Sequence, residues 1–203
     1  MKLHFRLTSV KQKYKMMRGE ILLPINVGKR IAIIGPMASG KSTLAVKFGA
    51  VLKIPVYHLD QLCFLPGTFW AKRPEKEFKK LHDEIISHDS WIMEGNFETL
   101  LPQRLSRAST LIWLNPPFWR CVFNFYKRFF RKNRHNTTYP GRLQNAREEF
   151  TICQLKYIFI HKFHRKILKK MIKEHFNGKV FCVRHWKDVK TLFPFRKTHA
   201  EET

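Results

Sequence analysis

The feature that most constrains the fold of this chain is the segment GPMASGKST at residues 35–43. Gly35, Gly40, Lys41 and Ser42 satisfy the pattern G-x-x-x-x-G-K-[ST]. Because glycine makes up about 7% of residues in average proteins, these four positions coincide by chance in roughly one chain of this length in a hundred. The pattern is that of a P-loop, whose backbone amides and lysine hold phosphate groups. The alternative is a glycine turn with an incidental lysine.

The residues on both sides support the P-loop interpretation. Residues 30–35 are an apolar, β-branched run that predicts a strand buried on both faces. Residues 41–52 have apolar positions at helical spacing, so a helix N-terminus would add its positive dipole end to the loop. We expect Lys41 to reach the β and γ phosphates and Ser42 to ligate Mg²⁺. The full set expected to bind ATP is Gly35, Pro36, Met37, Ala38, Ser39, Gly40, Lys41, Ser42 and Thr43.

Further strands are predicted at residues 54–58, 90–95, 110–114 and 179–183, and helices at residues 73–86 and 150–175. Strands that alternate with helices indicate an α/β, doubly wound fold. We therefore predict a three-layer α/β/α P-loop NTPase with a five-stranded, mostly parallel sheet and a helical lid. The expected division is a basic extension at 1–28, a P-loop kinase-like domain at 29–193 with its lid region at 115–150, and a tail at 194–203.

Two acidic residues follow predicted strands at the edge where open α/β sheets bind ligands. Glu94 ends one strand, and its expected role is to hold the metal or position water; the alternative is a solvated acid at a helix entrance. Asp60 follows another, and its expected role is catalytic or substrate-orienting; the alternative is a cap on the next turn. We interpret His58 as a packed strand residue rather than a catalyst.

These segments together resemble a known family. Glu94-Gly95-Asn96-Phe97 looks like the Asp-Gly-Phe-Pro-Arg segment of adenylate kinases. Its combination with His58-Leu59-Asp60, Pro66-Gly67 and Trp91-Ile92 more closely resembles the bacterial DNA topology modulation proteins, in the adenylate kinase and shikimate kinase branch of P-loop proteins. The resemblance implies a kinase-like fold with an arginine-bearing lid. It departs at Asn115 and Phe118, where the family usually has Asp and Arg, and at Glu94, where Asp is commoner.

The remaining site predictions concern the residues that contact the phosphate acceptor and the residue that contacts the adenine base of ATP. Asn96 and Arg104 are expected to contact the substrate, Arg104 by holding an anionic group; the alternative is a surface arginine. Arg184 follows the last predicted strand, where this fold usually holds adenine, and stacking on the base is expected there.

The positive charge of the chain is concentrated in particular segments rather than spread evenly along the sequence. The formal net charge is +24, yet residues 31–114 have ten basic and eight acidic residues, whereas residues 115–175 have fifteen basic and three acidic. A kinase lid needs arginines that approach the transferred phosphoryl group, and Arg128, Arg131 and Arg134 are the candidates. Basic and aromatic interleaving also suits nucleic acid.

A third interpretation of the same region is a core helix with a solvated basic face. On a helix, one apolar face would be formed by Trp119, Val122, Phe123, Tyr126 and Phe130.

The function expected from these patterns is ATP- and Mg²⁺-dependent phosphoryl transfer to a small molecule or nucleotide. The alternative is a nucleic-acid-associated NTP-binding protein. The four cysteines are too far apart in sequence for a zinc site or a dense disulfide framework, and no apolar run is long enough to span a bilayer. We expect a cytoplasmic protein with no integral membrane segment.

Overall fold

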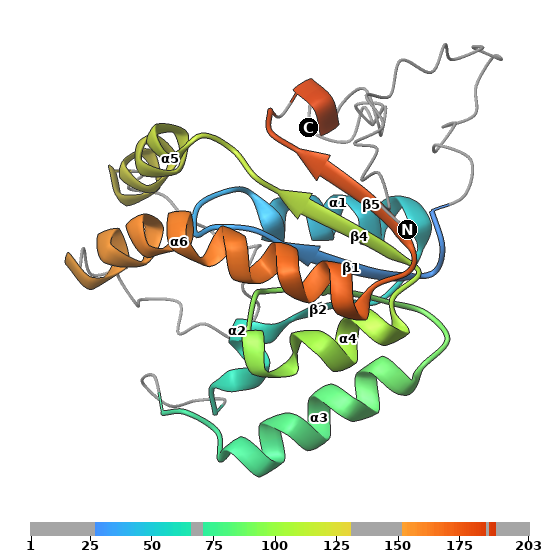
Figure 1. Ribbon diagram of the computed structural model, residues 1–203. Helices are drawn as coiled ribbons and strands as arrows, with labels where there is room; N and C mark the ends of the chain where they lie inside the picture. The colour runs from blue at the N-terminus through green and yellow to red at the C-terminus, as the bar shows by residue number, and fades with distance from the viewer. Residues whose placement is uncertain (1–26, 66–70, 131–151, 186, 190–203) are drawn as a thin grey trace, which may run out of the picture.

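The computed structural model describes residues 27–65, 71–130, 152–185 and 187–189 (Figure 1). Its centre is a sheet of five strands that pair in parallel throughout, in the order β2-β3-β1-β4-β5. The strands are β1 (Arg30–Ile34), β2 (Val56–His58), β3 (Trp91–Glu94), β4 (Thr110–Leu114) and β5 (Lys179–Val183). All five were predicted from short β-branched or aromatic runs, and the pairing confirms the α/β fold class.

The helices lie between the strands. They are α1 (Lys41–Leu52), α2 (Leu59–Cys63), α3 (Glu75–Ser87), α4 (Leu101–Arg107), α5 (Phe118–Phe130) and α6 (Ile152–His175), with a 3₁₀ turn η1 (Glu98–Leu100) just before α4. The predicted helices correspond to α1, α3, α5 and α6. Three short elements, α2, η1 and α4, were not predicted because segments of three to seven residues are too short to show a helical period.

Alternate side chains of the sheet enter two separate cores. Ile31 and Ile33 of β1 are fully buried on the face covered by α1. Ala32 and Ile34 are fully buried on the other face, with side chains of α3, α4 and α6. Figure 1 shows α1 behind the sheet and these helices in front of it. The result is the three-layer α/β/α arrangement that the sequence predicts.

Helix α5 is not a core helix buried through its aromatic face, so that interpretation is wrong. Trp119 and Phe123 are each 62% exposed and Tyr126 is 40% exposed. The buried side chains are Cys121 and Phe125, which pack on the phosphate loop. Because the loop is the surface beneath α5, the small thiol and one phenyl ring fill that contact and the larger aromatic side chains lie outward.

Several predictions fall outside the described residues. These include most of the N-terminal extension, the tail, the side chain of Arg128, and both Arg131 and Arg134. Within the described residues, no helix combines the length and apolarity needed to cross a membrane. Cys63, Cys121 and Cys182 are free thiols.

Candidate functional site

The phosphate loop leaves β1 at Gly35 and enters α1 at Lys41. Gly35 packs so closely on β4 that an added Cβ would lie 2.4 Å from the carbonyl oxygen of Leu114, which explains the need for glycine. Gly40 precedes α1 in the left-handed conformation with φ of 93°. Its carbonyl accepts the hydrogen bond from Leu44 N, 3.0 Å away, that closes the first turn of the helix. The strand, loop and helix thus follow one another as the sequence predicts.

Three side chains fix the loop. Lys41 Nζ donates to the carbonyl oxygen of Pro36 at 2.9 Å, so its ammonium lies over the loop where phosphates would bind. Asn96 Oδ1, from the segment after β3, accepts a hydrogen bond from the backbone N–H of Gly35 at 3.0 Å. Asn124 Nδ2, from α5, donates to the carbonyl oxygen of Ala38 at 3.1 Å. Asn124 was not predicted, because a lone asparagine in an aromatic helix carries no motif.

Glu94 lies at the centre of the site. One of its oxygens, Oε1, accepts a hydrogen bond from Ser42 Oγ at 2.8 Å and also lies 2.8 Å from His58 Nδ1. Glu94 is 2% exposed and His58 is 6% exposed. The interpretation of Glu94 as a solvated acid is therefore wrong. His58 is a packed strand residue, as predicted, but sequence reasoning missed its contact with Glu94, although both residues lie at the ends of predicted strands at one edge of the sheet.

The surroundings of Glu94 favour its ionised form. Burial alone raises the pKa of this carboxyl. The hydrogen bond from His58, the nearby charge of Lys41 and the hydrogen bond from Ser42 together outweigh burial, and they hold the pKa of Glu94 below its usual value. A carboxylate can only accept hydrogen bonds, so His58 Nδ1 carries the proton in this pair.

The chemistry of these donors fits Mg²⁺. This ion prefers oxygen ligands, keeps several waters, and is usually bound by one or two protein groups together with substrate phosphates. The Ser42 hydroxyl and the ionised Glu94 are oxygen donors in mutual contact at the start of α1. In the described parts of the chain, no group of three or more His, Cys, Asp or Glu side chains forms a separate metal site.

Arg104 is fully buried, so the alternative of a surface arginine is wrong. It lies on α4, and its Nη2 donates to the carbonyl oxygens of Gly95 and Asn96, both at 2.8 Å. These are the residues that follow β3 and include the anchor of Gly35. Asp60 is exposed in the first turn of α2, directly after β2 and therefore at the same edge of the sheet as Glu94.

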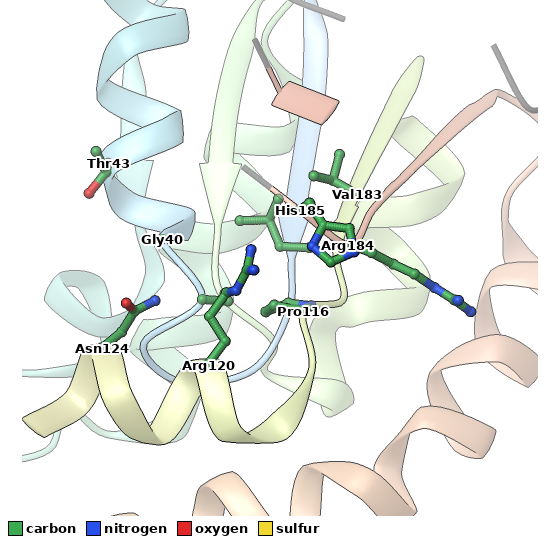
Figure 2. Close-up of a pocket in the computed structure, with 10 residues that line it drawn as sticks. Gly40, Thr43, Pro116, Arg120, Asn124, Val183, Arg184 and His185 are labelled. Carbon is green, nitrogen blue, oxygen red and sulfur yellow. The ribbon is translucent and has the colours of Figure 1, made fainter. Parts of the chain in front are cut away.

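A second part of the site is a pocket of about 320 Å³ between the phosphate loop, the end of β4, α5 and the turn after β5 (Figure 2). Arg120 of α5 points into this space, whereas the side chain of Arg184 extends away from it. Asp188 Oδ2 accepts hydrogen bonds from the backbone N–H groups of Arg184 and His185 and so shapes the turn. Sequence reasoning missed Arg120 as a lining residue, and base stacking by Arg184 stays a prediction.

A phosphate loop at the carboxyl edge of a parallel sheet in the order β2-β3-β1-β4-β5, with helices on both faces, defines a three-layer P-loop fold. No family model and no curated protein matches the chain.

Solved structures of similar fold include two shikimate kinases. The enzyme from Acinetobacter baumannii, in complex with shikimate, is 15% identical, with 82% of this chain and 93% of that one covered and a TM-score of 0.46. The enzyme from Bacteroides thetaiotaomicron is 17% identical, with 80% and 97% covered and a TM-score of 0.47. Deoxyadenosine kinase from M. mycoides with bound dATP is 14% identical, with 80% and 94% covered and a TM-score of 0.44.

Proposed function

We propose that this chain binds ATP with Mg²⁺ and transfers the terminal phosphoryl group to a small-molecule or nucleotide acceptor. The observation that carries the proposal is the 2.8 Å hydrogen bond from Ser42 to the buried, ionised Glu94. It brings the hydroxyl of a phosphate loop and an acidic strand end to one point, which is what metal-assisted phosphoryl transfer requires. Neither a glycine turn nor a structural acid needs this pairing.

Each part of the site has a role in this proposal. The amides of Gly35–Gly40 and the N-terminus of α1 bind the phosphates, and Lys41 exchanges its contact with Pro36 for one with the β and γ phosphates. Ser42 and Glu94 hold Mg²⁺, which would neutralise charge on the phosphate oxygens. The pocket between the phosphate loop, α5 and the turn after β5 would hold the base of the nucleotide, and we call it the base-side pocket. Thr43, at the exposed side of the first turn of α1, lines this pocket together with Arg120.

The acceptor side rests on fewer contacts. Asp60 is the exposed carboxylate at the carboxyl edge, and we assign it to orient or deprotonate the acceptor hydroxyl. Asn96 lies between this region and the phosphate loop, since its side chain reaches Gly35. Arg128 and Arg131 remain the proposed lid arginines that would stabilise charge on the transferred group.

The test is a screen for acceptor-dependent release of ADP. Purified protein is incubated with Mg²⁺-ATP and separate pools of nucleosides, nucleotides and small hydroxylated metabolites, with the Lys41→Ala variant as the control. We expect one pool to raise ADP release at least about tenfold in the wild type and not in the variant. ADP release that no pool stimulates, or that persists in Lys41→Ala, would count against a kinase.

A second candidate function is association with nucleic acid, and one observation favours it. Helix α5 presents Trp119 and Phe123 to solvent, with the Arg120 guanidinium 5.2 Å from the Trp119 ring centre and Lys127 exposed nearby. Exposed aromatic rings beside cations bind single strands, because bases stack on the rings and phosphates pair with the cations. This surface agrees with the chain's net charge of +24 and with the resemblance to DNA topology modulation proteins.

Salt dependence separates the two candidates. Binding through six or more phosphate contacts weakens by about a thousandfold between 50 and 200 mM salt, whereas ATP binding in the loop changes far less. The measurement is fluorescence anisotropy of a labelled single-stranded oligonucleotide, with a Trp119→Ala, Phe123→Ala double variant as the control. If the oligonucleotide does not bind at 50 mM salt while ATP still stabilises the protein, the second candidate is eliminated.

A further inference from the structure

We propose that Arg104 is a positioning residue for the phosphate loop, acting through the segment Gly95–Asn96. It would fix where the amide of Gly35 points, and so set the affinity for nucleotide, without touching the nucleotide itself. This inference rests on the proposed function, because it treats the loop as a nucleotide site. It also assigns Arg104 a role different from the substrate contact expected from the sequence.

The burial of Arg104 indicates a specific role. Its side chain is fully buried, and a guanidinium held away from water is destabilising unless protein groups accept hydrogen bonds from it. Burial lowers the pKa of Arg104, partly offset by the charge of Glu94, and the group stays protonated at neutral pH. Among the described residues, Arg104 Nε and Nη1 have no hydrogen-bond partner. The hydrogen bonds of the buried guanidinium are therefore those that Nη2 donates to the segment Gly95–Asn96.

Those contacts lead directly to the loop. Arg104 Nη2 holds the carbonyl oxygens of Gly95 and Asn96, each at 2.8 Å, and so fixes two successive peptide units. The Asn96 side chain then accepts the hydrogen bond from Gly35 N at 3.0 Å. Two consecutive contacts therefore join a buried charge on α4 to the first residue of the phosphate loop.

The other sides of the segment are also constrained. Gly95 N donates to the carbonyl oxygen of Ile33 at 3.1 Å, which ties it to β1. Gly95 has φ of 134°, and an added Cβ would lie 2.9 Å from Leu59 Cβ. The backbone of Gly95 is thus hydrogen-bonded to β1 and packed against α2. The Arg104 guanidinium holds the carbonyl oxygens of the same segment from the α4 side. Loss of that support frees the carbonyl side of Asn96, and with it the direction of its side chain.

The experiment is a double-mutant cycle with two variants, Arg104→Gln and Asn96→Ala, and their combination. The dissociation constant for Mg²⁺-ADP is measured by calorimetry well below each melting temperature. We expect Asn96→Ala, which loses a neutral hydrogen bond, to weaken binding by about fivefold, and Arg104→Gln, which loses charged hydrogen bonds, to weaken it by about tenfold. The dissociation constant of the double variant should be no higher than that of the single variant with the lower affinity, because both changes break the same chain of contacts from Arg104 through Asn96 to Gly35.

Controls separate positioning from stability. Leu105→Ala removes a buried side chain from the same helix and should lower the melting temperature while leaving the dissociation constant within about twofold. Arg104→Lys keeps the charge but not the planar fork, so it should fold more readily than Arg104→Gln and restore only part of the affinity. Effects that multiply in the double variant, or unchanged affinity in both folded Arg104 variants, overturn the proposal.

A measurement without nucleotide distinguishes failure of the positioning role from failure of the proposed function. Hydrogen exchange of the Gly35 amide, followed by NMR in the nucleotide-free protein, should become about tenfold faster in Asn96→Ala and in Arg104→Lys but not in Leu105→Ala. If the wild type binds no nucleotide yet Gly35 exchange responds in this way, the kinase proposal fails and the positioning role stands. If exchange does not respond, the positioning role fails.

Discussion

The Nδ1 atom of His58 lies 2.8 Å from Oε1 of Glu94, and both side chains are more than nine-tenths buried. The same carboxylate oxygen accepts the hydrogen bond from Ser42. Glu94 thus joins the end of β2 to the start of α1 through one atom. This arrangement keeps the carboxylate ionised and fixes its direction at the proposed Mg²⁺ site beside Ser42.

The first prediction concerns the metal. Glu94→Gln keeps the size of the side chain and removes its charge, so the Mg²⁺ contribution to nucleotide binding should fall. We expect the ratio of ATP affinities with and without Mg²⁺ to decrease by about tenfold or more, since a hydrogen bond or ligand contact to a charged group contributes about 1.5–3 kcal/mol. Calorimetric titrations with and without EDTA measure the ratio. An unchanged ratio would remove Glu94 from the metal site.

The second prediction concerns acid stability. Because the pKa of Glu94 is lowered in the folded protein, its ionisation stabilises the fold fully above pH 4.5, and this contribution is lost as pH falls through the folded pKa. The difference in free energy of unfolding between wild type and Glu94→Gln should therefore shrink from pH 6 to pH 3. Urea denaturation at a series of pH values measures it. A difference that is constant or grows on acidification would contradict the assigned direction.

The third prediction concerns the base-side pocket. Arg120 points into the space beside the phosphate loop, and a cation facing an aromatic base contributes about 0.5–2 kcal/mol. Arg120→Ala should weaken ATP binding by roughly 2- to 30-fold and leave inorganic triphosphate binding nearly unchanged. Lys127→Ala, at an exposed position of the same helix, is the matched control. Equal losses for ATP and triphosphate would place Arg120 at the phosphates instead.

The fourth prediction concerns the acceptor. Asp60→Asn should lower kcat by about a hundredfold or more, the range typical of general acid–base groups, while the ATP dissociation constant stays within about twofold. Asp89→Asn is the control, because Asp89 is an exposed acid just before β3, at the opposite edge of the sheet. A loss of ATP affinity equal to the loss of kcat would indicate that Asp60 serves the nucleotide rather than the acceptor.

The fold was predictable because its signals are local. A β-branched run, a glycine loop and an amphipathic helix follow one another between residues 30 and 52, and the remaining strands repeat the same kind of run. The positions of Glu94 and Asp60 at the carboxyl edge were predictable for the same reason, since the ends of parallel strands meet at one edge. Nothing beyond strand prediction was required.

The parts that could not be predicted depend on contacts between distant segments. Arg104 lies 69 residues after Gly35 in the sequence, yet it is linked to Gly35 through Asn96, and the burial of Arg104 leaves no pattern in one sequence. The buried face of α5 is another case. Hydrophobicity favours Trp119 and Phe123 as the inward residues, yet packing on the phosphate loop selects Cys121 and Phe125.

The central claim, that the loop binds a nucleotide through Lys41, is tested most directly by calorimetric titration of ATP with Mg²⁺ into wild type and Lys41→Ala. Lys80→Ala, an exposed lysine of α3, is the control. We expect saturable binding to wild type and to Lys80→Ala, and a dissociation constant at least about tenfold higher in Lys41→Ala. Absence of saturable binding of ATP and GTP to the wild type, or equal binding by Lys41→Ala, would contradict the central claim.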